Sequence, residues 1–178
     1  MLPRSWSTSF LLASLVLFGL APALPVLRAD EPPSAQPLAE KILAAAGVQG
    51  GIVVHLGCGD GRLTAALRAD DAFTVHALER DPALVQTARE HVDNLGRYGP
   101  VSVEHWTRST LPYADNLVNL VVVSGPSSVE RTEILRVLAP GGAAVFSSSD
   151  HEPQITDVIV KPRPDTIDQW THFLHDAG

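Results

Sequence analysis

The stretch from Gly51 to Leu67, GIVVHLGCGDGRLTAAL, constrains the fold more than any other part of the chain. Its first six residues form a short apolar, β-branched run, which is typical of a strand buried on both faces. Glycines follow at positions 57, 59 and 61, and a helical pattern begins directly behind them. A strand that passes through a glycine turn into a helix is a building unit of open parallel α/β sheets.

The same alternation of strand and helix continues along the chain. Four further strands are predicted, at FTVHALE, VSVEHW, LVNLVVVS and AAVFSS, and ITDVIVKP is a candidate sixth. Helical segments of suitable length separate them, which implies right-handed crossovers and a mostly parallel sheet. We therefore predict an α/β, Rossmann-like open sheet with helices on both faces, truncated at its C-terminal end, as one domain over residues 38–150.

The helix boundaries are predicted from proline, glycine and capping residues. Pro37 opens a helix whose apolar face is formed by Leu38, Ile42 and Ala45, and Gly47 ends it. A later helix begins with Asp81 as its cap and ends at Gly96. Its expected buried face comprises Leu84, Val85, Ala88, Val92 and Leu95. A third helix, SSVERTEILRVL, is expected to be capped by Ser127 or Ser128, followed by a turn at APGG.

The N-terminal segment differs in composition from the rest of the chain. Residues 1–29 combine a basic start, an apolar middle and small residues, which predicts a signal peptide or an N-terminal anchor. Residues 30–37 have the proline and polar content of a linker. We expect export to the periplasm or cell envelope, without stable membrane contact beyond this segment. If the segment has another role, the protein is cytoplasmic.

Composition excludes several classes of function. The formal net charge is -7 and the basic residues are scattered, so binding to nucleic acid is not expected. A single cysteine, Cys58, rules out an intramolecular disulfide, and we expect it to pack rather than react. Among seven histidines, only His172 and His175 have the spacing of a ligand pair, without a third ligand nearby, so no metal is expected. His151 is a candidate general base that no pattern supports.

The candidate site combines the glycine turn with an acidic residue. In open parallel sheets, ligands bind beyond the carboxyl ends of the strands, where the strand order reverses. Glycine permits positive φ and lets the turn approach a ligand with its amides exposed. Glu79 ends the second predicted strand, 22 residues after Gly57. A carboxylate at this position can accept hydrogen bonds from both hydroxyl groups of a ribose. We therefore predict a nucleoside site; Ser124, at the end of the fourth strand, is a candidate lining residue.

Four segments resemble the successive motifs of class I S-adenosylmethionine-dependent methyltransferases of the small-molecule branch. They are VVHLGCGDGR, VHALERDPALVQTARE, LPYADNLVNLVVV and EILRVLAPGGAAVF. The resemblance implies that S-adenosyl-L-methionine is the cofactor and a small molecule the methyl acceptor. It further implies the cofactor-binding residues, which are Gly57, Cys58, Gly59, Asp60, Gly61, Glu79 and Arg80. Catalytic residues are not identified, and methyl transfer needs little beyond alignment of the reacting atoms.

Three positions depart from the family pattern. His55 stands where the family has an acidic residue, Thr107 where it often has an aspartate that contacts the adenine, and Asn119 where it has an aspartate at the start of the fourth strand. Each difference replaces a charged hydrogen-bonding group, typically worth ~1.5–3 kcal/mol. We expect weaker cofactor binding unless other groups compensate.

An alternative function is an exported, degenerate methyltransferase-like module for binding or docking without turnover. Export separates the domain from a cofactor made in the cytoplasm. Residues 151–178 form a predicted C-terminal extension, in which residues 160–178 resemble the lead-in to a pyrroloquinoline-quinone-type propeller. That resemblance predicts a propeller partner domain in a longer chain. A nicotinamide-dependent oxidoreductase is disfavoured, because Arg62 occupies the third glycine position of the dinucleotide fingerprint.

Overall fold

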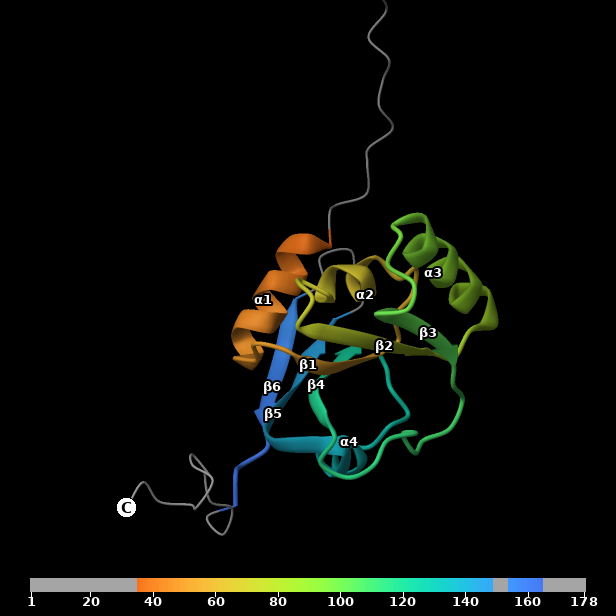
Figure 1. Ribbon diagram of the computed structural model, residues 1–178. Helices are drawn as coiled ribbons and strands as arrows, with labels where there is room; N and C mark the ends of the chain where they lie inside the picture. Colours follow the sequence, from red (N-terminus) through yellow and green to blue (C-terminus); the bar gives the residue numbers. More distant parts are fainter. Residues whose placement is uncertain (1–34, 149–153, 165–178) are drawn as a thin grey trace, which may run out of the picture. The chain divides into compact units, whose positions relative to one another are not determined.

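The fold is a six-stranded sheet in the order β3-β2-β1-β4-β5-β6 (Figure 1). We describe a computed structural model that covers residues 35–148 and 154–164. Strands β1 to β5 are parallel to their neighbours and β6 is antiparallel to β5. The strands are β1 (Gly51–Leu56), β2 (Phe73–Glu79), β3 (Val101–His105), β4 (Val118–Ser124), β5 (Leu138–Ser147) and β6 (Ile155–Val160). The predicted fold class is confirmed, including the sixth strand.

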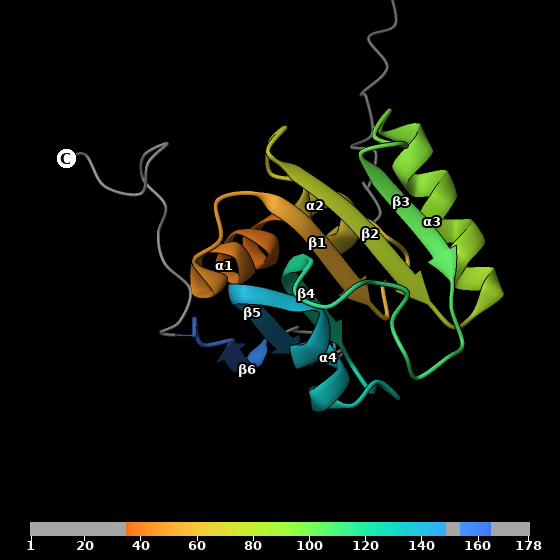
Figure 2. The same cartoon turned by 60° about the horizontal axis from the view of Figure 1, so that its bottom comes forward.

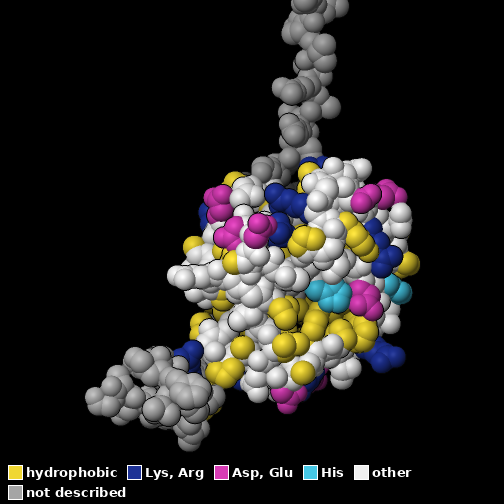
Figure 3. All heavy atoms as spheres, viewed as in Figure 1, with side chains coloured by type: hydrophobic (Ala, Val, Ile, Leu, Met, Phe, Trp, Pro, Cys, Tyr) yellow, Lys and Arg dark blue, Asp and Glu magenta, His cyan; other side chains and the backbone are white. Residues whose placement is uncertain are grey.

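Helices cover the two faces of the sheet unequally. One face carries α1 (Gln36–Ala46), α2 (Arg62–Leu67) and α3 (Pro82–Asn94), whereas α4 (Arg131–Val137) lies on the other (Figure 1). The connection from β3 to β4, residues 106–117, contains no helix and runs as a long loop (Figure 2). Hydrophobic side chains gather at the surface between β2 and α4, on the face of the sheet that carries α4 (Figure 3).

The helix boundaries predicted at glycine and proline are confirmed, but two buried faces are shifted. Gly47 ends α1 with φ of 66°, and the Asp81 carboxylate accepts from the Ala83 amide at 2.8 Å at the start of α3. The buried face of α1 consists of Ala39, Ile42 and Ala46. Ala39 and Ala46 thus take the places predicted for their neighbours Leu38 and Ala45. On α3, the predicted core residues Leu84 and Leu95 are 37% and 51% exposed. Helix α3 lies beside the edge strand β3, where fewer neighbours cover its flanks.

The region from β4 to β5 differs most from prediction. Helix α4 begins after Glu130, and the Ser127 hydroxyl instead accepts from the Val129 amide within the preceding loop. The APGG segment, expected as a turn before the fifth strand, lies inside β5 as an irregularity in its pairing with β4. A Cβ atom on Gly142 would lie 2.9 Å from the Ala139 oxygen, so this irregularity requires glycine there.

Candidate functional site

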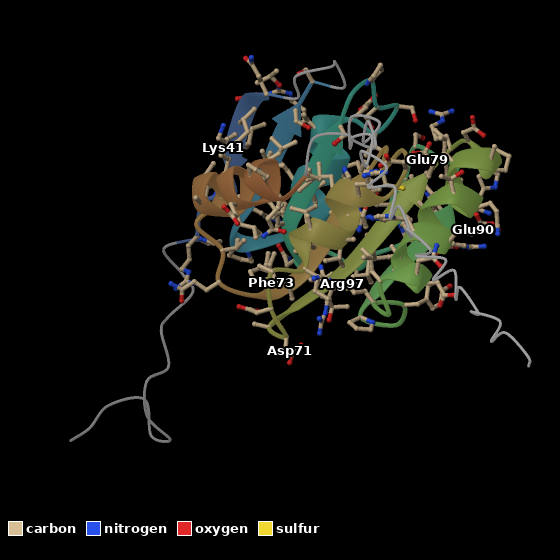
Figure 4. All side chains as sticks on the ribbon, turned by 90° about the horizontal axis from the view of Figure 1, so that it is seen from above. Lys41, Asp71, Phe73, Glu79, Glu90 and Arg97 are labelled. Atoms are coloured by element: carbon tan, nitrogen blue, oxygen red, sulfur yellow. The ribbon has the colours of Figure 1, made fainter. Side chains whose placement is uncertain are left out.

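The strand order places the glycine turn at the centre of the sheet. Strand β1 lies between β2 and β4. The next strands along the chain, β2 and β3, lie on one side of it, and β4 to β6 lie on the other. The ends of all three strands meet at one edge, which is the ligand-binding position of open parallel sheets. Glu79, the last residue of β2, lies at the end of that strand opposite Phe73 (Figure 4). The predicted site residues of β1 and β2 are therefore brought together at this edge.

The three glycines of the turn are required for different reasons. All have positive φ: 73° at Gly57, 56° at Gly59 and 81° at Gly61. A Cβ atom on Gly57 would lie 2.6 Å from the Ser124 oxygen, and one on Gly61 would lie 2.8 Å from the Ala88 Cβ. Nothing lies within 4 Å of the Cβ position of Gly59. Gly57 and Gly61 therefore permit close packing within the protein, whereas Gly59 leaves open space above the turn.

The amides of these glycines do not match the prediction that they face a ligand. Gly57 donates to the Leu78 oxygen at 3.0 Å and Gly61 to the Cys58 oxygen at 3.1 Å, so both amides bind the protein itself. The Asp60 carboxylate accepts from the Arg62 amide at 3.1 Å and caps the start of α2. The turn is thus held by internal hydrogen bonds, and a ligand would meet its surface rather than a row of free amides.

Glu79 points at the turn, as predicted. Its side chain is only 7% exposed, and its Oε2 accepts from the Gly59 amide at 2.9 Å. Its Oε1 accepts from the amides of Arg80 at 2.7 Å and Asp81 at 3.2 Å. A carboxylate offers about four acceptor positions. Three are occupied, so one remains for a further donor.

A small pocket opens beside this carboxylate. Its volume is about 80 Å³. Across its rim, the Arg80 guanidinium donates to the Ser128 hydroxyl and joins the loop after β2 to the loop after β4. The lining residues are Leu56, Gly57, Leu78, Glu79, Arg80, Trp106, Arg108, Pro126, Ser127, Ser128 and Val129. Arg80 thus lies beside the pocket, and its contact with an adenine stays a prediction.

His55 lies buried beneath the turn in a polar network. Its Nδ1 is 2.8 Å from the Thr64 Oγ1 and its Nε2 is 2.8 Å from the Ser124 Oγ. The Ser124 Oγ is also 3.2 Å from the Ser147 Oγ. Burial lowers the pKa of His55 to about 4, so the imidazole is neutral at pH 7. Ser124, predicted to line the pocket, instead bonds within the protein, and Ser147 is buried at the end of β5.

Asn119 does not belong to the site, contrary to the prediction that its identity affects cofactor binding. It lies near the start of β4 and pairs with Ile52 near the start of β1, at the opposite edge of the sheet. Its Oδ1 accepts from the Ile52 amide at 2.9 Å. A Cβ atom on Gly51 would lie 2.1 Å from that oxygen, so glycine there makes room for the amide. Thr107 is an exposed residue in the loop after β3.

Cys58 packs, as predicted. The side chain is buried, and burial together with the nearby Glu79 charge raises the pKa of its thiol to about 12. The thiolate, which is the reactive form, is therefore scarce at neutral pH.

No metal centre is found within residues 35–148 and 154–164, where no three His, Cys, Asp or Glu side chains are grouped suitably. In the same ranges, no helix is both long and apolar enough to span a membrane. Residues 1–29, most of the predicted linker, His151, His172 and His175 lie outside the described residues.

Comparison with known protein families identifies the domain. The sequence profile of a methyltransferase domain matches residues 53–142, half of the chain. The chain belongs to this methyltransferase family. No curated protein matches the sequence. The propeller lead-in predicted for residues 160–178 finds no support in these comparisons.

Solved structures share the fold of the methyltransferase domain. A protein of Methanococcus maripaludis, described as an S-adenosyl-L-methionine-dependent methyltransferase, is 23% identical, with 64% of this chain and 55% of that one covered and a TM-score of 0.57. The [4+2]-cyclase SpnF is 22% identical, with 64% and 44% covered and a TM-score of 0.57. Geranyl diphosphate C-methyltransferase from Streptomyces coelicolor, solved with Mg²⁺, geranyl diphosphate and S-adenosyl-L-homocysteine, is 18% identical, with 63% and 45% covered and a TM-score of 0.57. The chain thus spans about half the length of these proteins.

Sequence reasoning missed several residues of the methyltransferase domain that shape this edge. Arg108 and Ser128 line the pocket, and Thr64 belongs to the buried network. Their positions in loops or at a helix start carry no distinctive pattern. The one available signal was polar residues at the ends of otherwise apolar strands, such as Ser124 and Ser147.

Proposed function

We propose that this domain binds S-adenosyl-L-methionine and transfers its methyl group to a small-molecule acceptor. The observation that carries the proposal is the orientation of Glu79, whose buried carboxylate points at the glycine turn from the neighbouring strand. Membership of the methyltransferase family supports it.

The residues present fit a nucleoside cofactor in two respects. The open space at the Cβ position of Gly59 leaves the top of the turn free for a ligand. The remaining acceptor position on Glu79 suits a sugar hydroxyl, because a buried carboxylate binds such donors strongly. Gly57, Cys58, Gly59, Asp60 and Gly61 would form the wall under the methionine end, and Arg80 would flank the adenine. When bound, the cofactor supplies an electrophilic methyl group on a sulfonium.

The protein's own contribution would be binding and alignment. Holding the acceptor and the methyl carbon in line supplies much of the rate enhancement in such reactions. General-base catalysis by the buried groups near the turn is not expected. Both ring nitrogens of His55 contact hydroxyl groups, and the Cys58 thiol stays protonated at neutral pH. An acceptor is therefore expected to be nucleophilic without help from these two residues.

The pocket has to widen for this function. Its volume of about 80 Å³ is below the roughly 300–1,000 Å³ of typical ligand pockets. The contact between Arg80 and Ser128 crosses the rim, so binding would separate these two side chains.

Isothermal titration of the purified domain with S-adenosyl-L-homocysteine tests the proposal. We expect saturable binding at micromolar concentrations, and no heat at high micromolar ligand would contradict it. A second measurement, transfer of a labelled methyl group to a panel of small-molecule acceptors, separates turnover from binding.

A second candidate function is a methyltransferase-like binding module without turnover. The observation that favours it is the neutral His55 in place of an acidic residue, together with the small pocket. Binding of S-adenosyl-L-homocysteine without methyl transfer to any acceptor would support this alternative, and measurable transfer would exclude it.

We further propose that the N-terminal segment directs export and that the chain works beside a propeller domain. The composition of residues 1–29 and the sequence of residues 160–178 support these two proposals. Fusion of residues 1–37 to a reporter that is active only outside the cytoplasm tests the first. Sequencing the DNA that follows the codon for Gly178 tests the second.

A further inference from the structure

Most of the buried polar side chains in the described residues lie in one network beside the glycine turn. Four such side chains are buried: His55, Thr64, Glu79 and Ser147. Glu79 binds the turn from β2, and the other three are joined through Ser124. Because burial of a polar group without a partner costs free energy, a network of this kind fixes the elements it connects.

The network joins four separate elements at the edge. His55 is the penultimate residue of β1, Thr64 is the third residue of α2, and Ser124 and Ser147 end β4 and β5. The backbone of the glycine turn also lies close to the end of β4, because a Cβ atom on Gly57 would lie 2.6 Å from the Ser124 oxygen. The glycine turn is therefore positioned between the start of α2 and the end of β4.

One assignment of the protons satisfies all four contacts of the network, including that of Ser147 with the Val123 oxygen. The Ser147 hydroxyl donates to the Val123 oxygen at 3.4 Å, so its single proton is used. With that proton used, Ser124 donates its own proton to Ser147 in this assignment, at 3.2 Å. With no proton left, Ser124 can only accept from the His55 Nε2. Neutral imidazole carries one proton, so Nδ1 is the acceptor and Thr64 donates to it at 2.8 Å.

We propose that His55 is a positioning residue: as the Nε2–H tautomer it ties the start of α2 to the end of β4, and so fixes the glycine turn that faces Glu79. Its effect on ligand binding rests on the proposed function, but the tie itself does not. Ser124, as an acceptor from His55 and a donor to Ser147, is not free to donate to a ligand. His55 itself is only 1% exposed and is not a catalytic residue.

The tautomer is tested without any ligand. In protein labelled with ¹⁵N-histidine at pH 7, we expect the NMR resonances of His55 to show a protonated Nε2 and an unprotonated Nδ1. A protonated Nδ1, or rapid exchange between the two tautomers, would overturn the assignment.

The positioning role is tested by amide hydrogen exchange at Gly59, whose N–H donates to Glu79. Thr64→Val removes the hydroxyl at constant shape, whereas Thr64→Ser keeps it, and Ser124→Ala removes the partner on β4. We expect Thr64→Val and Ser124→Ala each to raise the exchange rate of the Gly59 amide by about tenfold. We expect Thr64→Ser, and Ser109→Ala at an exposed loop position, to leave it near the wild-type rate.

Unchanged exchange in both Ser124→Ala and Thr64→Val would overturn the positioning role. If one of these variants fails to fold, the other and the tautomer measurement still decide the question. Titration with S-adenosyl-L-homocysteine adds the link to function, and we expect Ser124→Ala to weaken affinity by about tenfold. If the wild-type protein does not bind this probe, the proposed function fails, while the exchange and NMR results still test the tie.

Discussion

Glu79 and Gly59 are joined by a hydrogen bond of 2.9 Å between a carboxylate on β2 and an amide in the turn after β1. This contact lies at the point where the strand order reverses. It fixes the orientation of the one buried carboxylate among the described residues and holds the turn against the neighbouring strand. The same group therefore serves the structure of the turn and the proposed recognition of a ribose.

Replacing this carboxylate should affect both roles. In Glu79→Gln, one of the two acceptor oxygens becomes an NH₂ donor that faces backbone N–H groups. Hydrogen bonds to a charged group are worth ~1.5–3 kcal/mol each, so we expect a lower free energy of unfolding and at least about tenfold weaker binding of S-adenosyl-L-homocysteine. Urea denaturation and isothermal titration measure the two effects. Glu90→Gln, at an exposed position on α3 (Figure 4), is the matched control and should change neither.

The glycines of the turn should separate stability from binding. Gly57→Ala places a methyl group 2.6 Å from the Ser124 oxygen, so we expect a loss of several kcal/mol of stability, in addition to ~1 kcal/mol for the positive φ. Gly59→Ala meets open space, and we expect only the cost of its positive φ. Its methyl group would nevertheless occupy the space above the turn and weaken ligand binding. Equal unfolding free energies for the two variants, measured in urea, would contradict this assignment.

The fold could be predicted because strand and helix signals agree along the whole core. Apolar runs such as GIVVHL, with glycine or proline at their ends, leave few other arrangements. The start of α4 could not be predicted, because Ser127 and Ser128 are good capping residues and only the tertiary path of the loop places the helix start at Glu130. The exposure of Leu84 likewise depends on where α3 lies relative to the edge of the sheet.

The site was predicted where a residue's role follows from the end of a strand, and missed where it follows from packing. The position of Glu79 at the end of β2 was sufficient to predict its orientation toward the turn. The hydrogen bond from the Gly57 amide to the Leu78 oxygen depends on how closely the end of β1 approaches the end of β2. The pairing of His55 with Thr64 and Ser124 depends on the register of separate elements, which no local pattern specifies.

Asn119 should affect stability and leave ligand binding unchanged. Asn119→Ala removes the acceptor for the Ile52 amide, and an unsatisfied, partly buried donor costs ~1–3 kcal/mol. Because the residue lies at the opposite edge from Glu79, we expect the affinity for S-adenosyl-L-homocysteine to stay within about twofold of wild type. Asn119→Asp, which keeps an acceptor oxygen, should recover part of the stability. A large loss of affinity in a folded Asn119→Ala protein would contradict the assignment of Asn119 to a position outside the site.

Removing the contact across the rim should ease ligand entry. Ser128→Ala deletes the hydroxyl that accepts from the Arg80 guanidinium. If the two loops must separate before binding, we expect faster association of S-adenosyl-L-homocysteine and an affinity equal to or higher than that of wild type. Stopped-flow measurement of intrinsic tryptophan fluorescence, with Trp106 in the pocket lining, follows the association. Slower association in Ser128→Ala would show that the contact helps to form the site rather than to close it.

His55 should give the protein a specific dependence of stability on pH. Its pKa is about 4 in the folded protein, whereas its ordinary value is 6.5. Between these two values the unfolded chain binds a proton that the folded protein does not, so the free energy of unfolding rises with pH across this window. At ~1.4 kcal/mol for each pH unit, the full effect is about 3 kcal/mol, present above pH 6.5 and lost toward pH 4.

The variant His55→Gln isolates this dependence, because glutamine does not titrate and still carries one donor and one acceptor. Other groups with shifted pKa values, including His76, lowered by burial, and Glu133, lowered by Arg136, remain in both proteins. We therefore expect the difference in unfolding free energy between wild type and His55→Gln to grow as the pH rises from about 4 to 6.5. Urea denaturation at several pH values measures it, and parallel pH profiles for the two proteins would show that His55 is not held neutral in the folded state.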